Sequence, residues 1–130
     1  MVQNQFDNHT IKIDISGEDF SLFGYQSEFI QVLLILLHNA KDALVESRGN
    51  SPKVWIILSE KKRRFQIIDN AGGIKSEIIE HIFEQHRSTK LDKEGSGIGL
   101  QLAKVIIEER IGFRIVAENS KEGAIFTIMA

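Results

Sequence analysis

Cysteine is absent from the sequence, and proline, tryptophan and tyrosine occur once each. The absence of cysteine excludes disulfides, thiolate metal sites and cysteine nucleophiles, and it is compatible with the cytoplasm. Long apolar runs are also missing, because the longest aliphatic run, Val32 to Leu37, is far too short to cross a bilayer. The polar start at residues 1–5 has no signal-peptide core. We therefore expect a soluble, cytoplasmic domain that makes no membrane contact itself, whether or not a longer parent protein is anchored in a membrane.

An excess of charge of either sign is missing as well. Sixteen lysine and arginine residues stand against eighteen aspartate and glutamate residues, a formal net charge of −2. This balance disfavours a generally basic nucleic-acid binder, and 42% hydrophobic with 26% charged residues is ordinary for a globular protein. The basic cluster Lys61 to Arg64 is either a solvated hairpin turn or a phosphate-binding patch, and the lack of interleaved aromatic residues favours the turn. The length predicts one domain over residues 1–130.

Apolar residues that alternate along the chain predict strands, and apolar residues at helical spacing predict helices. The expected strands are Ile11–Ile15, Phe20–Phe23, Val54–Ser59, Phe65–Asp69, Phe113–Glu118 and Ala124–Met129. The expected helices run from Ser27 to about Asn50, from Ser76 to Phe83, and from Gly97 to Arg110. Residues 84–96 are polar without a period, which predicts a long functional loop. This order predicts an α/β fold, a two-layer sandwich in which a mixed sheet carries helices on one face.

A polar stripe lies along the long helix that is expected to begin at Ser27. At about 100° per residue, its members share one narrow face of the helix: Gln31, His38, Asn39, Asp42 and Glu46. Asn is a poor helix former, so an interior Asn39 followed by Asp42 hints at a polar ligand or at a metal ion with oxygen ligands. A solvent-facing edge explains the stripe equally well. Ile35 lies in the middle of this stripe, which is odd for a polar site.

The segment Asp69-Asn70-Ala71-Gly72-Gly73-Ile74 follows an apolar strand. A carboxylate at the end of a strand can accept a hydrogen bond from an exocyclic amine such as adenine N6, and glycines leave room for a ring to approach. The alternative is an ordinary turn from strand to helix, with Asp69 as a capping residue. Taken alone, the motif favours the ordinary turn.

The segment Gly95-Ser96-Gly97-Ile98-Gly99-Leu100 opens the last expected helix. Exposed backbone N–H groups and a helix amino end make such a segment a phosphate cradle, although a glycine-rich helix start alone is a weak signal. A Walker A loop is excluded because Leu100-Gln101 follows Gly99, and a dinucleotide fold is disfavoured because a polar loop precedes the glycines. The four histidines are scattered and form no hydrolase or zinc motif.

These three segments, in this order, resemble the ATP-binding domain of sensor histidine kinases, whose superfamily includes DNA gyrase B, the Hsp90 chaperones and the MutL proteins. Gln31 to Ala43 resembles the family's N box, and Asp69 to Ile74 resembles its first glycine box. Ile82 to Lys90 resembles the phenylalanine box, and Gly95 to Leu100 resembles the second glycine box. The resemblance covers about Tyr25 to Ile128 and implies the Bergerat-type α/β sandwich.

The resemblance also implies roles for single residues. Asn39 would coordinate Mg²⁺ on the triphosphate, Asp69 would bind adenine N6, and Gly73 would let the purine ring pack closely. Lys90 in the expected ATP lid would touch the γ-phosphate, so Asn39 and Lys90 are the candidate catalytic residues. The candidate ligands of Mg-ATP are Asn39, Asp42, Asp69, Gly73, Ile74, Lys90, Gly95, Ser96, Gly97, Ile98, Gly99 and Leu100.

Three positions depart from the family pattern. Ile35 stands where these kinases commonly have a second Asn and gyrase-like ATPases have a catalytic Glu, which argues against water activation by that route. His86-Arg87 replaces common aromatic residues of the phenylalanine box. Ala124 replaces a Thr found near the adenine in many relatives, so we expect one water-mediated contact to be missing.

The activity implied by the resemblance is transfer of the γ-phosphoryl group of Mg-ATP to a histidine on a separate dimerisation domain, with a response regulator downstream. The acceptor histidine is not expected in this chain. Two alternatives stay open: a serine kinase of the anti-sigma-factor type with the same fold, and a nucleotide-sensing module that transfers nothing. Neither alternative requires a nucleic acid.

Overall fold

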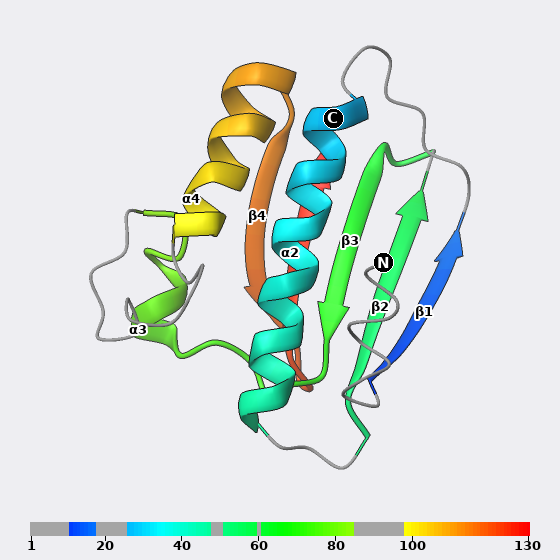
Figure 1. Cartoon of the computed structure of the whole chain (residues 1–130), viewed down its shortest axis with the longest axis vertical. Helices are drawn as coiled ribbons and strands as arrows, with labels where there is room; N and C mark the ends of the chain where they lie inside the picture. Colours follow the sequence, from blue (N-terminus) through cyan, green and yellow to red (C-terminus); the bar gives the residue numbers. More distant parts are fainter. Residues whose placement is uncertain (1–10, 18–25, 48–50, 60, 85–97) are drawn as a thin grey trace.

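A computed structural model describes residues 11–17, 26–47, 51–59, 61–84 and 98–130 of the chain. Five strands form one sheet, and the helices lie on one side of it (Figure 1). The strands are β1 (Lys12–Gly17), β2 (Lys53–Ser59), β3 (Arg64–Asp69), β4 (Arg114–Asn119) and β5 (Ala124–Met129). The helices are α2 (Gln26–Ser47), α3 (Ser76–Ile79), α4 (Ile98–Val105) and the π-helical η2 (Ile106–Ile111).

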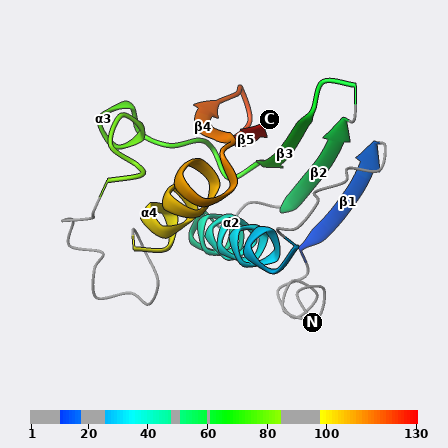
Figure 2. The same cartoon turned by 90° about the horizontal axis from the view of Figure 1, so that it is seen from above.

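The sheet is mixed, with the strand order β1-β2-β3-β5-β4. β1 runs parallel to β2, whereas β2, β3, β5 and β4 form antiparallel pairs. The view from above shows two layers, with α2 and α4 side by side on the same face of the sheet (Figure 2). The predicted α/β sandwich is therefore confirmed. The basic cluster at residues 61–63 lies in the exposed turn of the β2–β3 hairpin, as the solvated-turn interpretation predicts.

The core lies between the helices and the sheet, because each element turns its apolar residues to that interface. Along α2 the buried residues recur at helical spacing: Val32, Leu36, Leu37, Ala40 and Leu44. In β2 and β3, alternate residues are buried, as expected for a sheet with one covered face. None of the helices in the described ranges is long and apolar enough to span a membrane.

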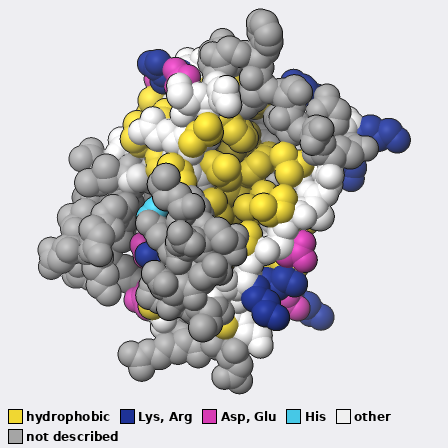
Figure 3. Space-filling model, turned by 45° about the vertical axis from the view of Figure 1, so that its right-hand side comes forward, with side chains coloured by type: hydrophobic (Ala, Val, Ile, Leu, Met, Phe, Trp, Pro, Cys, Tyr) yellow, Lys and Arg dark blue, Asp and Glu magenta, His cyan; other side chains and the backbone are white. Residues whose placement is uncertain are grey.

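Some apolar surface stays exposed beside this core. Figure 3, turned so that the β1 side comes forward, shows a group of hydrophobic side chains on that side of the molecule. Ile15 on β1 and Ile30 on α2 are exposed, and Ile13 and Leu58 are half-buried. The helices α2 and α4 thus cover the middle of one face of the sheet, and the part of that face near β1 is less covered.

The helical segments differ in detail from the sequence prediction. The helix predicted over Ser76 to Phe83 is α-helical only to Ile79, and turns follow to residue 84. The helix predicted over Gly97 to Arg110 is α-helical from Ile98 to Val105 and then widens into η2. The predicted strand Phe20–Phe23 lies outside the described residues, as does the predicted loop at 84–96 except for residue 84.

The widened turn of η2 has a local cause. Gly112 adopts a left-handed φ of 91°, and the N–H groups of Gly112 and Phe113 both donate to the carbonyl oxygen of Ile107, each over 2.9 Å. This wide cap lets Ile106, Ile107 and Ile111 all enter the core. The predicted helix is thus present, but its last turn is wound as a π-helix, which the sequence pattern did not predict.

Candidate functional site

Asp69 is the last residue of β3, and its side chain is only 3% exposed. Its Oδ1 accepts hydrogen bonds from the backbone N–H groups of Ala71, at 3.0 Å, and Ala124, at 3.3 Å. Its Oδ2 accepts none from any described residue. Burial raises the pKa of Asp69, and the two backbone hydrogen bonds oppose that rise. Among the described residues, the protein therefore fixes one oxygen of Asp69 and donates no hydrogen bond to the other.

Residues 70–74, which we call the strap, connect β3 to α3. Gly72 and Gly73 have φ values of 98° and 94°, a region that residues with a Cβ rarely adopt. The N–H of Gly72 donates to the carbonyl oxygen of Glu122 over 2.9 Å. A Cβ on Gly73 would lie 3.1 Å from Oδ1 of Asn119. The glycines predicted to allow close approach are therefore required by the backbone conformation itself.

Two asparagine side chains tie the strap to neighbouring segments. Asn70 accepts the N–H of Lys53 and donates to the carbonyl oxygen of Ser51, both over 2.9 Å. Asn119, at the end of β4, accepts the N–H of Ile74 and donates to the carbonyl oxygen of Ile74, both over 2.8 Å. Asn119 was missed by the sequence analysis, since its partner lies 45 residues away.

Gly123, which lies between the predicted strands Phe113–Glu118 and Ala124–Met129, packs directly on Asp69. A Cβ at this position would overlap the backbone carbonyl of Asp69 and would lie 2.7 Å from its Oδ1. Gly123 also donates its N–H to Oγ of Ser120, which fixes the turn before β5. Ala124 is buried, and its N–H reaches Asp69, so the backbone contact survives at this departure from the family pattern. The only sequence signal for these roles is a glycine directly before a strand.

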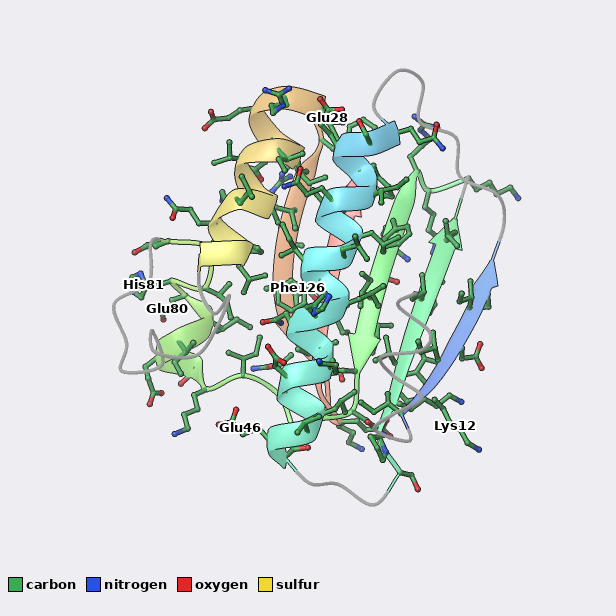
Figure 4. The ribbon with its side chains drawn as sticks, in the orientation of Figure 1. Lys12, Glu28, Glu46, Glu80, His81 and Phe126 are labelled. Carbon is green, nitrogen blue, oxygen red and sulfur yellow. The ribbon has the colours of Figure 1, made fainter. Side chains whose placement is uncertain are left out.

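The polar stripe of α2 has two parts. Gln31, His38, Asp42 and Glu46 are exposed, which agrees with a solvent-facing edge. Asn39 is half-buried, and its side chain makes no hydrogen bond to a described residue. Figure 4 labels Glu28 near the amino end of α2 and Glu46 near its carboxyl end, so Asn39 belongs to the half of α2 toward which β3 runs (Figure 1). The carboxyl half of α2, which includes Asn39, and the carboxyl end of β3, which is Asp69, therefore lie toward the same end of the molecule.

Ile35 interrupts the stripe because it points to another neighbour. Its Cγ2 lies 3.2 Å from the position that a Cβ on Gly99 would take, and the half-buried side chain packs against the core. Gly99 thus lets the first turn of α4 approach α2 closely. The expectation that the whole stripe faces a polar ligand is corrected at this position.

The second glycine box is only partly described. The described residues do not include Lys90, Gly95, Ser96 and Gly97. For Ile98 the structure describes the backbone but not the side chain. The side chain of Leu100 is buried in the core, which leaves its backbone as the part that can face a ligand.

In the phenylalanine box, His86-Arg87 is outside the described residues. The ring of Phe83 contacts the ring of Phe126 edge to face, with the ring centres 6.1 Å apart. Nζ of Lys104 lies 5.4 Å from the ring centre of Phe83.

The comparisons agree with this arrangement of glycines, carboxylate and helices. Residues 24–130 match the family model of histidine kinase-, DNA gyrase B- and HSP90-like ATPases. The chain belongs to this family. Its match covers the N box, the strap with Asp69, and the start of α4. The predicted ATP-binding domain of histidine kinase type is confirmed.

The similar curated proteins of this ATPase family are sensors. The two-component sensor PprA of Pseudomonas aeruginosa is 31% identical over 110 residues, which are 81% of this chain and 12% of PprA. The sensor protein CitS of Halalkalibacterium halodurans is 32% identical over 124 residues, which are 91% of this chain and 22% of CitS. The chain therefore spans less than a quarter of the length of these relatives.

Solved structures show the same fold. The catalytic domain of histidine kinase ThkA matches with a TM-score of 0.79 at 23% identity, over 97% of this chain and 82% of that chain. ThkA in complex with the response regulator protein TrrA matches with a TM-score of 0.70 at 24% identity, over 98% of this chain and 37% of that chain. The five-stranded mixed sheet with its helices is thus the fold of histidine kinase catalytic domains.

Proposed function

We propose that this domain binds Mg-ATP and donates its γ-phosphoryl group to a histidine on a separate dimerisation domain of a sensor kinase. The observation that carries the proposal is Asp69, a buried carboxylate with one oxygen held by two backbone N–H groups. A buried acceptor without a partner is costly unless a ligand supplies a donor. The exocyclic amino group of adenine is such a donor.

Selectivity for adenine follows from the same oxygen. Oδ2 of Asp69 accepts a hydrogen bond from the N6 amino group of adenine, whereas guanine carries a carbonyl oxygen at that position. With guanine, two hydrogen-bond acceptors would face each other in a buried site, so the site should discriminate strongly against guanine nucleotides. Gly73 and Ile74 of the strap would lie against the purine, since Gly73 has no side chain to hold it away.

The phosphates and the metal ion would lie between α2 and the amino end of α4. Mg²⁺ usually keeps several waters and takes one or two protein oxygens together with phosphate oxygens. The half-buried side-chain amide of Asn39 fits this pattern, because it makes no hydrogen bond to any described residue. No group of three or more His, Asp or Glu side chains able to hold a metal occurs in the described ranges, so most ligands would come from the phosphates and water. Asp42, Lys90 and residues 95–100 would complete the phosphate site.

The transfer step needs positioning and charge stabilisation more than covalent help from the protein. Ile35, one helical turn before Asn39, offers no base that could activate water, and it packs against Gly99. The domain would therefore hold ATP without hydrolysing it quickly and would present the γ-phosphate to the acceptor histidine. The ThkA–TrrA complex supports a response regulator as the next acceptor in the pathway. We also propose that this domain is intracellular, since ATP and response regulators are found inside the cell.

The test of the proposal is calorimetric titration of ADP and ATP with Mg²⁺ into the chain and its Asp69→Asn variant. An amide cannot supply the same charge-assisted acceptor, so we expect binding to weaken at least about tenfold. Asp14→Asn, on exposed β1, is the matched control and should leave the Kd unchanged. Equal affinities of Asp69→Asn and the wild type would contradict the proposed adenine contact.

A further inference from the structure

The side chain of Asn119 makes a two-point contact with the backbone of Ile74. Its Oδ1 accepts the N–H of Ile74 and its Nδ2 donates to the carbonyl oxygen of Ile74, both over 2.8 Å. A residue in an adjacent strand pairs in the same way, so the amide replaces a strand for one residue. Among the described residues, Ile74 makes no other backbone hydrogen bond.

The strap depends on such a contact because of its two glycines. Gly72 and Gly73 both adopt left-handed φ values, and glycine loses more conformational freedom on ordering than any other residue. Asp69, Asn70 and the Gly72–Glu122 bond anchor the strap only up to Gly72. Beyond it, the side chain of Ile74 packs against the core, but the hydrogen bonds that the described residues make to the backbone of Ile74 all come from Asn119.

We propose that Asn119 is a positioning residue that holds the strap in its nucleotide-binding conformation without touching the nucleotide. The inference rests on the proposed function, in which Gly73 and Ile74 lie against the purine. A strap that samples several conformations binds with an affinity reduced by the fraction of time spent in the competent one. Asn119 therefore raises affinity for adenine nucleotides by raising that fraction.

The position of Asn119 separates this role from a structural one. Asn119 is exposed at the end of β4, and the ladder between β4 and β5 is formed by backbone groups. Removing an exposed amide there should change the free energy of unfolding little. The order of the strap, by contrast, depends on the amide directly. Stability and nucleotide affinity should consequently respond differently to substitution.

The experiment compares the wild type with Asn119→Ala and Asn119→Asp, and uses Glu118→Ala on the same strand as the control. The aspartate has the shape of asparagine but cannot donate to the carbonyl oxygen of Ile74. Amide hydrogen exchange without nucleotide is followed at Ile74 and at the core residue Ile67. The Kd for Mg-ADP and the melting temperature are measured on the same samples.

In both Asn119 variants we expect faster exchange at Ile74, unchanged exchange at Ile67, and ADP binding weakened about tenfold. Glu118→Ala should match the wild type throughout. Wild-type affinity in Asn119→Asp would overturn the two-point contact, and an equal rise of exchange at Ile74 and Ile67 would overturn the positioning role in favour of general loosening. A wild type that binds no ADP would overturn the proposed function instead, and unchanged affinity in Asn119→Ala beside a wild type that binds would overturn this inference alone.

Discussion

Ile35 is a single side chain whose surroundings decide what the polar face of α2 can do. It is half-buried, packs against the core, and lies beside Gly99 at the start of α4. An asparagine there would place an amide against the core and the start of α4, where the isoleucine makes apolar contacts. A buried amide without a partner costs roughly 1–3 kcal/mol in addition to the apolar contacts that are lost.

We therefore predict that Ile35→Asn lowers the melting temperature by several degrees and leaves the Mg²⁺ dependence of ADP binding unchanged. The matched control is Ile30→Asn on the same helix, whose isoleucine is 46% exposed and which should cost much less stability. Thermal unfolding and ADP titrations at several Mg²⁺ concentrations give both readouts. A stable Ile35→Asn variant with steeper Mg²⁺ dependence would show that position 35 faces the nucleotide.

Local signals found some functional residues and missed others. Asp69 and Gly73 stand out in the sequence because an apolar strand, a carboxylate and two glycines follow one another directly. Asn119 and Gly123 do not stand out, because they contact Ile74 and Asp69, which are distant in the sequence. Their roles depend on β5 lying beside β3, a neighbour relation that no local pattern encodes. The ligand-binding roles of Asn39, Asp69, Gly73, Lys90 and the second glycine box all stay predictions.

At the scale of the elements, periodicity predicted every described strand within about two residues, since one covered face imposes clear alternation. It did not predict that β5 would lie between β3 and β4, because strand order depends on long-range packing. It also missed the change from α4 to η2. Helix winding there is decided by the cap at Gly112 and by the packing of the isoleucines before it.

Two glycines that end or begin elements should respond differently to alanine. Gly112 has a left-handed φ but open space for a Cβ, so Gly112→Ala should cost roughly 1–2 kcal/mol of stability and leave ADP affinity unchanged. Gly123 has no open space, because a Cβ would overlap the carbonyl of Asp69. Gly123→Ala should displace Asp69 and weaken ADP binding strongly. Thermal unfolding and calorimetry of both variants check this, and equal ADP affinities in the two variants would contradict it.

At the scale of the whole molecule, the proposed nucleotide site lies near the ends of several elements. The carboxyl half of α2 and the carboxyl end of β3 lie toward one end of the fold, and the amino end of α4 lies beside the middle of α2 (Figure 1). The turn between β4 and β5 supports that end through Asn119, Glu122 and Ala124. A site supported by so many segments is preorganised for the nucleotide, which is the main requirement of phosphoryl transfer.

The acceptor of the phosphoryl group has a stricter requirement, because it must approach the γ-phosphate in line. His38 is exposed on α2, and His81 follows α3, where its Nδ1 lies 2.8 Å from Oε2 of Glu84, so both belong to the ATP-binding domain itself and not to a separate domain. We predict that the isolated chain incubated with γ-labelled ATP acquires no acid-labile label and releases phosphate only slowly. Adding a histidine-bearing dimerisation domain of a sensor kinase should produce the label. A strong acid-labile label on the chain alone would contradict the placement of the acceptor on a separate domain.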